Sequence, residues 1–191
     1  MLLGTVQGVT HAALVDASFD RPAARVIVAG FDEPRASTNL GWTFGPWERD
    51  SRDPSEFCHV TLSADPRFGA AGASVRLDYD VDSPAPAYNG LWVKLPLVRV
   101  QEYEALSVVL KGDPARGFTH RLKLELKDGQ QVATVVLDGI DGMWRRFRIP
   151  LSAFRGIHQI ETATEFVVVF DDLTSTQKIG TIFLDEVAFE E

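Results

Sequence analysis

Carboxylates that could hold a metal ion stand near both ends of this chain of 191 residues. Near the C-terminus, Asp185 interrupts a strongly apolar segment. In an extended strand it would share one side with Phe183, Val187 and Phe189. Burying an unpaired carboxylate costs roughly several kcal/mol, so Asp185 needs a strong partner. Asp32 and Glu33 follow an apolar segment near the other end. We therefore expect a closed β-sandwich whose ends meet, in which a metal ion is one way to neutralise the carboxylates.

A second set of side chains has the types needed to bind a sugar. Sugars present apolar C–H faces that stack on aromatic rings, and hydroxyls that charged side chains can bind. The predicted strand 91–95 and the residues just before it carry two aromatic residues and a lysine. The predicted strand within 118–127 carries a row of polar residues on one side. The candidate residues are Tyr88, Trp92, Lys94, Arg121, Lys123 and Glu125.

These two strands form a glycan-binding face only if they are neighbours in one sheet. The alternative is a solvated outer face with cross-strand ion pairs, in which Trp92 is covered by residues 1–25. Charged rows are the usual outer face of an antiparallel sheet, and that favours the alternative.

Catalytic chemistry has little support in the sequence. The four histidines are scattered without the spacing of metal ligands: His11, His59, His120 and His158. Cys58 and His59 are adjacent in an extended stretch, so their side chains should point apart. We expect His120 to be a core residue, because it alternates in phase with leucines. No Gly-Xaa-Ser-Xaa-Gly motif or phosphate-binding glycine loop is present, and we interpret the chain as non-catalytic.

The elements that must position these residues are predicted to be strands. Alternation of apolar and polar residues is strongest over 118–127, and helical periodicity is nearly absent. Turn signals such as Asp138-Gly139 separate the segments. Further strands are expected at 74–81, 91–95, 106–110, 131–137, 144–149, 165–170 and 181–189. Roughly eight to ten short strands predict an all-β fold, a two-sheet antiparallel β-sandwich of the jelly-roll type.

We expect two parts along the chain. Residues 1–25 read as an N-terminal extension or extra edge segment, and residues 26–191 as the sandwich domain. The longest irregular stretch, 33–56, contains Trp42 and Trp47, which either plug the end of the sandwich or form a docking surface. Trp144 opens a strand and is expected to pack under a loop.

Composition narrows the partners. The net charge of −8 argues against nucleic acid, and no run is apolar and long enough to span a membrane. The single cysteine, Cys58, excludes an intrachain disulfide. The start lacks the pattern of a signal peptide, which suggests a cytoplasmic protein if Met1 is native, and a periplasmic or extracellular one if a leader was replaced.

The order of these pieces resembles the jelly-roll modules of the galactose-binding-like superfamily, especially carbohydrate-binding modules related to family 11. The closing apolar strand with its mid-strand aspartate is the most recognisable part, and the Trp144 strand ending in Ile149-Pro150-Leu151 is the next. The other resembling segments are Gly30–Glu33, Asn39–Trp42, Ser74–Tyr79 and Tyr103–Ser107.

The resemblance implies a non-catalytic module that binds glycans on one sheet, with a structural calcium near the two termini. Asp185 and Asp32 match positions where the family supplies carboxylates, and Glu33 can substitute for Asp32. The alternative is that Asp185 accepts backbone N–H bonds with no ion. Related domains also occur in assembly factors for respiratory complexes, so a protein-interaction subunit is the second functional hypothesis, with other protein subunits as partners.

Overall fold

The computed structural model describes residues 25–32 and 43–191, and this part of the chain forms two antiparallel sheets. The strands are β1 (Arg25–Ala29), β2 (Phe44–Glu48), β3 (Phe57–Ser63), β4 (Ser74–Asp80), β5 (Tyr88–Arg99), β6 (Ala105–Gly112), β7 (Arg121–Asp128), β8 (Gln131–Asp138), β9 (Arg145–Pro150), β10 (Thr162–Asp171) and β11 (Ile179–Glu190). Three short 3-10 helices connect them: η1 (Val100–Glu102), η2 (Leu151–Ala153) and η3 (Ile157–Gln159). No helix within these ranges has the length and apolar character needed to cross a membrane.

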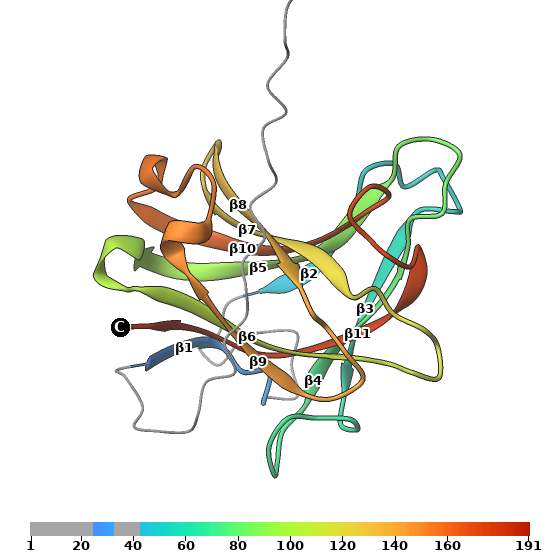
Figure 1. The fold of residues 1–191 in the computed structure, drawn as a ribbon, viewed down its shortest axis with the longest axis horizontal. Coiled ribbons are helices and arrows are strands. Elements are labelled where there is room, and N and C mark those ends of the chain that lie inside the picture. The colour runs from blue at the N-terminus through green and yellow to red at the C-terminus, as the bar shows by residue number, and fades with distance from the viewer. Residues whose placement is uncertain (1–24, 33–42) are drawn as a thin grey trace, which may run out of the picture.

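The two sheets lie face to face and enclose the core between them (Figure 1). One sheet has five strands in the order β2-β5-β10-β7-β8. The other has six, in the order β3-β4-β11-β6-β9, with β1 also paired to β11. The largest fully buried side chains are Tyr79, Phe31, Phe147, Phe166, Phe170 and Phe189. The predicted antiparallel sandwich is therefore confirmed.

Period-two alternation explains why these segments are strands. In β7, Leu122, Leu124 and Leu126 are fully buried, whereas the residues between them are partly exposed. Burying each leucine contributes about 1.5–3 kcal/mol, so the inward side of this strand alone stabilises the fold substantially. A shift of one residue would turn the leucines to solvent, which fixes the register of the strand.

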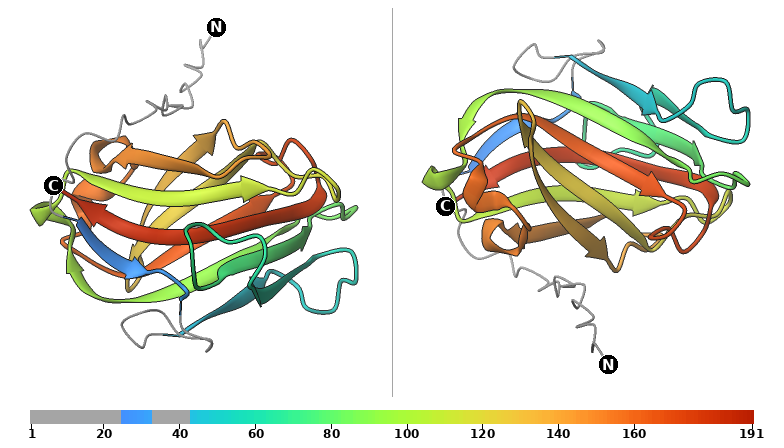
Figure 2. Two further views of the ribbon diagram at one scale, coloured as in Figure 1. Left: turned by 90° about the horizontal axis from the view of Figure 1, so that it is seen from below. Right: turned by 90° about the horizontal axis from the view of Figure 1, so that it is seen from above.

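The two ends of the described chain meet in the six-stranded sheet, as the sequence predicts. Strand β1 pairs antiparallel with β11, and Arg25 lies opposite Glu190. In the left view of Figure 2, β1 (blue) runs beside β11 (red) close to the C-terminus. Residues 1–24 and 33–42 lie outside the described part, and with them Glu33, Trp42 and the predicted N-terminal extension up to its last residue, Arg25, which belongs to β1.

The predicted side of Asp185 is wrong in one respect, because β11 contains a β-bulge. The pairing of β11 with β6 shifts register between Asp185 and Val187, and Glu186 has a positive φ of 38°. The bulge turns Val187 and Phe189 into the core, while Asp185 lies with Phe183 on the outer face of the sheet. Both halves of β11 therefore bury side chains in the core, and the Asp185 carboxylate lies on the outer side of the strand.

Two further predictions fail for local reasons. Strand β2 lies inside the stretch 33–56 that we expected to be irregular, and it carries Trp47. His120 is exposed and lies outside β7, because its backbone N–H bonds to Thr176 Oγ1 at 2.9 Å and not to a neighbouring strand. Its ring Nδ1 lies 2.7 Å from the carbonyl oxygen of Ile140, which holds it at the surface.

Candidate functional site

Two tryptophans cover glycines on the outer face of the five-stranded sheet, where β2 pairs with β5. Gly45 lies opposite Trp92, and Trp47 lies opposite Gly90. A Cβ atom built on Gly45 would lie 3.0 Å from Cζ2 of Trp92, and one on Gly90 would lie 3.3 Å from Nε1 of Trp47. Each indole therefore lies on the neighbouring strand at a position that has no side chain.

Tyr88 extends this surface toward the start of β5. Its ring centroid is 5.9 Å from that of Trp47, with the planes tilted by 51°. The ring of Trp92 is held by a hydrogen bond of 3.1 Å from its Nε1 to the carbonyl oxygen of Pro46. We call Trp47, Tyr88 and Trp92 the aromatic platform. Tyr88 is 42% exposed and both indoles are partly exposed, so the platform is open to solvent.

The absence of a side chain at Gly45 allows the indole of Trp92 to lie directly on strand β2. We expect Gly45→Val to push the indole off strand β2 and to weaken any binding to the platform, whereas Gly45→Ala should have a smaller effect in the same direction. The melting temperature of both variants should stay close to that of the wild type, because position 45 lies on the outer face of an edge strand. Binding isotherms of the two variants check this. Unchanged affinity in Gly45→Val would show that the position of Trp92 is irrelevant to binding.

The predicted polar row lies on the same outer face, but it is not next to the platform. Strand β10 lies between β5 and β7, so the row begins about 10 Å from β5, two strand spacings away. Val167 stands directly between Trp92 and Glu125, since it is opposite Trp92 on one side and Glu125 on the other. Strands β5 and β7 are therefore not neighbours, although the predicted glycan-binding face required them to be.

Each charged residue of this face has an oppositely charged neighbour. Lys94 pairs with Glu165, and its ammonium lies 5.7 Å from the centre of the Trp92 ring. The remaining pairs are Arg121 with Asp138 at 2.9 Å, Lys123 with Asp171 at 3.0 Å and Glu125 with Lys127 at 3.3 Å. The row therefore has the cross-strand ion pairs of the alternative interpretation, and the aromatic part of the face stands apart from it.

A second region of interest lies on the outer face of the six-stranded sheet, around Asp185. This carboxylate is only 2% exposed, and it accepts N–H bonds from Phe68 at 3.1 Å and from Glu186 at 2.8 Å. Asp32 lies in the same region, since its charge acts on the pKa of Asp185. The Oδ1 of Asp32 would lie 1.9 Å from a Cβ on Gly72. Gly72 has a φ of 88°, which favours glycine, and leaves room for the Asp32 carboxylate.

Burial raises the pKa of Asp185 to about 7, and the nearby negative charges of Asp32 and Glu186 add to the shift. The two backbone N–H bonds act in the opposite direction but do not cancel it. Glu186 itself has a pKa below its usual value despite its burial, because it receives hydrogen bonds from Arg25 and Arg146. Glu186 therefore has guanidinium partners, whereas the hydrogen bonds that Asp185 accepts come from backbone N–H groups.

An aromatic group lies beside this acidic pair. Trp144 is 6.1 Å from Phe68 and 6.4 Å from Phe183, measured between ring centroids, and Arg146 lies over Phe68. Phe68 belongs to the loop between β3 and β4, so Trp144 packs against a loop as expected from the sequence. The group contacts β11 through Phe183, and the backbone N–H of Phe68 bonds to Asp185.

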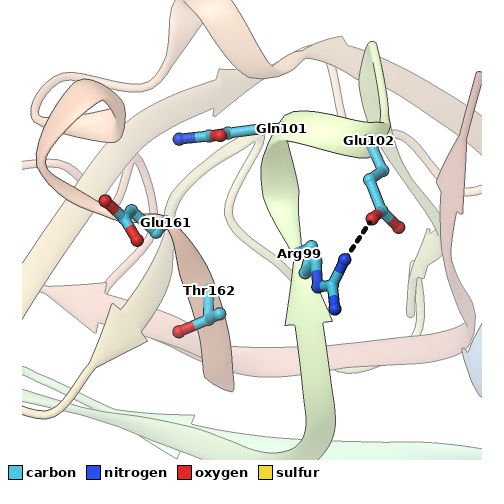
Figure 3. A pocket seen from close by; sticks show the side chains of 5 residues that line it. All are labelled: Arg99, Gln101, Glu102, Glu161 and Thr162. Carbon is cyan, nitrogen blue, oxygen red and sulfur yellow. Dashed lines mark hydrogen bonds and ion pairs between the residues drawn. The ribbon is translucent and has the colours of Figure 1, made fainter.

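A depression of about 410 Å³ lies at the far end of β5 from Tyr88. Figure 3 shows its lining, Arg99, Gln101, Glu102, Glu161 and Thr162, and the ion pair of 3.1 Å between Arg99 and Glu102. It has no aromatic side chain on which a sugar ring could stack. This depression therefore lacks the chemistry of the platform.

Cys58 is a free, buried cysteine. Burial raises the pKa of the Cys58 thiol, which keeps it protonated and unreactive. Within residues 25–32 and 43–191 no three His, Cys, Asp or Glu side chains are grouped to hold a metal ion. Asp32 and Asp185 are the predicted ligands that come close to each other in this part of the chain.

Of the predicted sugar-binding residues, the structure brings Tyr88 and Trp92 together in the platform, with Lys94 beside Trp92. Arg121, Lys123 and Glu125 lie beyond β10. Sequence reasoning missed Trp47 as a member of the platform. The alternation of Gly45, Trp47 and Arg49 within a stretch rich in glycine and proline is the signal that could have revealed strand β2.

The two sheets form the jelly-roll β-sandwich that is found in carbohydrate-binding modules. The family 11 module from Clostridium thermocellum, in complex with a β-1,3-1,4-mixed-linked tetrasaccharide, is similar with a TM-score of 0.65 at 13% identity, covering 89% of this chain and 97% of that chain. CBM27-1 from Caldicellulosiruptor saccharolyticus, in complex with mannohexaose, is similar with a TM-score of 0.54 at 12% identity, covering 87% and 97%.

The family 30 module of a cellulosomal cellulase from Clostridium thermocellum has a TM-score of 0.52 at 12% identity, covering 90% of this chain and 95% of that chain. The chain matches no protein-family model and no curated protein by sequence. At identities this low the likeness establishes the fold, and the function has to be argued from the residues of this chain.

Proposed function

We propose that this chain is a non-catalytic module that binds a glycan on the aromatic platform. The observation that carries the proposal is the seating of Trp47 and Trp92 over Gly90 and Gly45, with Tyr88 beside them. Rings held in this way lose little side-chain freedom when a ligand stacks on them, which favours binding. The similar modules with bound oligosaccharides support a glycan as the ligand class.

The charges on this sheet face favour a neutral glycan. Lys94, Lys123 and Arg121 each face a carboxylate, so none of the three offers an unpaired positive charge for an acidic polysaccharide. The chain as a whole carries a net charge of −8, which would repel a polyanion. Stacking on the platform and hydrogen bonds to hydroxyls are then the main attractive interactions.

Affinity electrophoresis against a panel of polysaccharides tests the proposal. The panel contains mixed-linkage β-1,3-1,4-glucan, β-mannan and xylan as neutral polymers, and polygalacturonate as an acidic one. We expect at least one neutral polymer to retard the protein and polygalacturonate to have no effect. Equal mobility in every gel would contradict glycan binding. Such a result, together with a protein partner that co-purifies with the chain, would favour the interaction-subunit hypothesis.

We further propose that a structural calcium ion binds next to β11, held by Asp185 and Asp32, with Glu33 as a third candidate from outside the described residues. The residues fit the ion in two respects. Calcium prefers carboxylate and carbonyl oxygens, and burial raises the pKa of Asp185 to about 7, with a smaller contribution from the charge of Asp32. Gly72 leaves the space that the Asp32 carboxylate occupies. When bound, calcium would supply a positive charge next to Asp185 and would link the segment after β1 to β11.

A further inference from the structure

Glu56 is a fully buried carboxylate at one end of the aromatic platform, with an exposed fraction of 1%. Its Oε1 accepts the backbone N–H of Arg49 at 2.8 Å and that of Tyr88 at 3.4 Å. Its Oε2 has no hydrogen-bond partner in the described part of the chain, and the Nε of Arg49 lies 3.5 Å away. Because a carboxylate is costly to bury, the position of Glu56 between Arg49 and Tyr88 needs an explanation.

The loop that carries Glu56 is firmly attached to its surroundings. Asp53 accepts hydrogen bonds from the N–H and hydroxyl of Ser55 at 2.9 and 2.7 Å. It also accepts a bond of 2.7 Å from the hydroxyl of Ser83, in the connection between β4 and β5. The backbone N–H of Glu56 bonds to the carbonyl oxygen of Asp53 at 3.1 Å. Glu56 therefore has a fixed place from which it can orient Arg49.

Arg49 comes directly after strand β2, two residues beyond Trp47, and it lies on the platform side. Its Cζ lies 5.9 Å from the centre of the Tyr88 ring, which in turn contacts Trp47. The side chain is 31% exposed. Among the described residues, no hydrogen-bond partner engages its Nη atoms, so the outer part of the guanidinium has donors to spare.

We infer that Arg49 is a further ligand-binding residue, which donates hydrogen bonds to hydroxyls of a sugar ring stacked on Tyr88 and Trp47, and that Glu56 is its positioning residue. This inference rests on the glycan-binding function proposed above. A guanidinium presents parallel donors in a rigid plane, which suits two adjacent hydroxyls. Because Glu56 offsets its charge, Arg49 suits neutral hydroxyls better than a sugar carboxylate.

The arrangement also makes the platform asymmetric. Trp92 stands four residues from Tyr88 along β5, about 13 Å away, with Lys94 next to it and already paired to Glu165. Arg49 stands at the other end, beside Tyr88. A donor pair at only one end gives a bound chain one preferred direction, so Arg49 contributes to specificity as well as affinity.

Two substitutions of Arg49 separate hydrogen bonding from stacking. Arg49→Met keeps a long apolar stem against Tyr88 but removes every donor, and Arg49→Lys keeps the charge but loses the planar donor pair. With oligosaccharides of mixed-linkage β-1,3-1,4-glucan, or of whichever neutral polymer retards the wild type, we expect Arg49→Met to bind about tenfold more weakly. Arg49→Lys should fall between Arg49→Met and the wild type. Arg49→Met leaves the buried Glu56 carboxylate without its guanidinium, so its melting temperature should fall, and circular dichroism establishes that it is folded at the temperature of the titration.

Glu56→Gln tests the positioning role. Its amide keeps one acceptor oxygen but places an N–H₂ group near Nε of Arg49, where two donors would repel. We expect binding nearly as weak as in Arg49→Met, and no additional loss in the double variant, because Glu56 acts through Arg49. If Glu56 had only a structural role, its substitution would weaken the Arg49→Met variant further.

The results distinguish this inference from the proposed function. Wild-type affinity in Arg49→Met, alongside weakened binding in Trp92→Ala, would overturn the role of Arg49 and leave glycan binding in place. An additive double variant would overturn the positioning role of Glu56. A wild-type protein that binds no polymer of the panel would overturn the proposed function, and this inference with it. The Arg49 variants test the ligand-binding role of Arg49 even if Glu56→Gln does not fold.

Discussion

Trp92→Ala is expected to weaken glycan binding by roughly 30-fold, the largest effect of any single substitution in the platform. Tryptophans that anchor a binding surface typically contribute about 2 kcal/mol or more, which corresponds to that factor. Trp92 is suited to this role because it lies over Gly45 and its Nε1 donates a bond of 3.1 Å to the carbonyl oxygen of Pro46. Isothermal titration with oligosaccharides of the polymer that retards the wild type measures the loss.

Two variants control this experiment. Trp92→Phe keeps an aromatic face and should retain part of the affinity. Leu173→Ala removes a side chain that is 90% exposed in the turn after β10, and it should bind as the wild type does. Circular dichroism establishes whether Trp92→Ala is folded. If the folded variant binds with wild-type affinity, the platform is not the glycan site.

Calcium is expected to raise the melting temperature of the wild type and to leave that of Asp185→Asn almost unchanged. An ion present at about 100 times its dissociation constant stabilises the native state by about 2.7 kcal/mol. For a domain of this size that corresponds to a shift of roughly 5–10 °C. Asp82→Asn, which changes an exposed aspartate, should respond to calcium as the wild type does. Thermal unfolding with calcium and with a chelator provides the comparison.

The pH dependence gives this prediction a second readout. In chelator, the pKa of Asp185 is about 7 in the folded state, above its ordinary value of 3.8. Its contribution to the unfolding free energy is therefore fully present below pH 3.8 and is lost as the pH rises through about 7. Calcium binds the ionised form, so the stabilisation by calcium should grow between pH 5 and pH 8.

Asp185→Asn should lack this pH-dependent response, because it cannot ionise. Identical effects of calcium on the wild type and on Asp185→Asn at every pH would show that the ion, if it binds, does so elsewhere. The absence of any calcium effect would favour the alternative that the two backbone N–H bonds of Phe68 and Glu186 are the only compensation for the buried carboxylate.

Local pattern was enough to predict the fold class. The leucines of β7 and the alternating residues of β4 define their buried sides without reference to any other segment. The meeting of the termini could also be predicted, since Asp185 needed a strong partner and acidic residues follow the apolar segment near the other end. These predictions succeed because burial and period-two alternation are properties of short segments.

The arrangement of strands could not be read from the sequence. Alternation shows which side of a strand is buried but not which strands are neighbours, so nothing indicated that β10 separates Trp92 from Lys123. The bulge at Glu186 depends on tertiary contacts, and it puts Asp185 and Val187 on opposite sides of β11. Trp47 was missed because the glycine and proline of β2 resemble a loop, although both are tolerated in an edge strand.

The most direct test of the platform is a titration followed by the indole N–H signals of the protein in solution. Signals of Trp47, Trp92 and Trp144 are assigned with single Trp→Phe variants, and oligosaccharide of the retarding polymer is then added. We expect the signals of Trp47 and Trp92 to shift and that of Trp144, on the outer face of the other sheet, to stay in place. Shifts confined to Trp144, with Trp47 and Trp92 unmoved at saturation, would contradict a glycan site on this face.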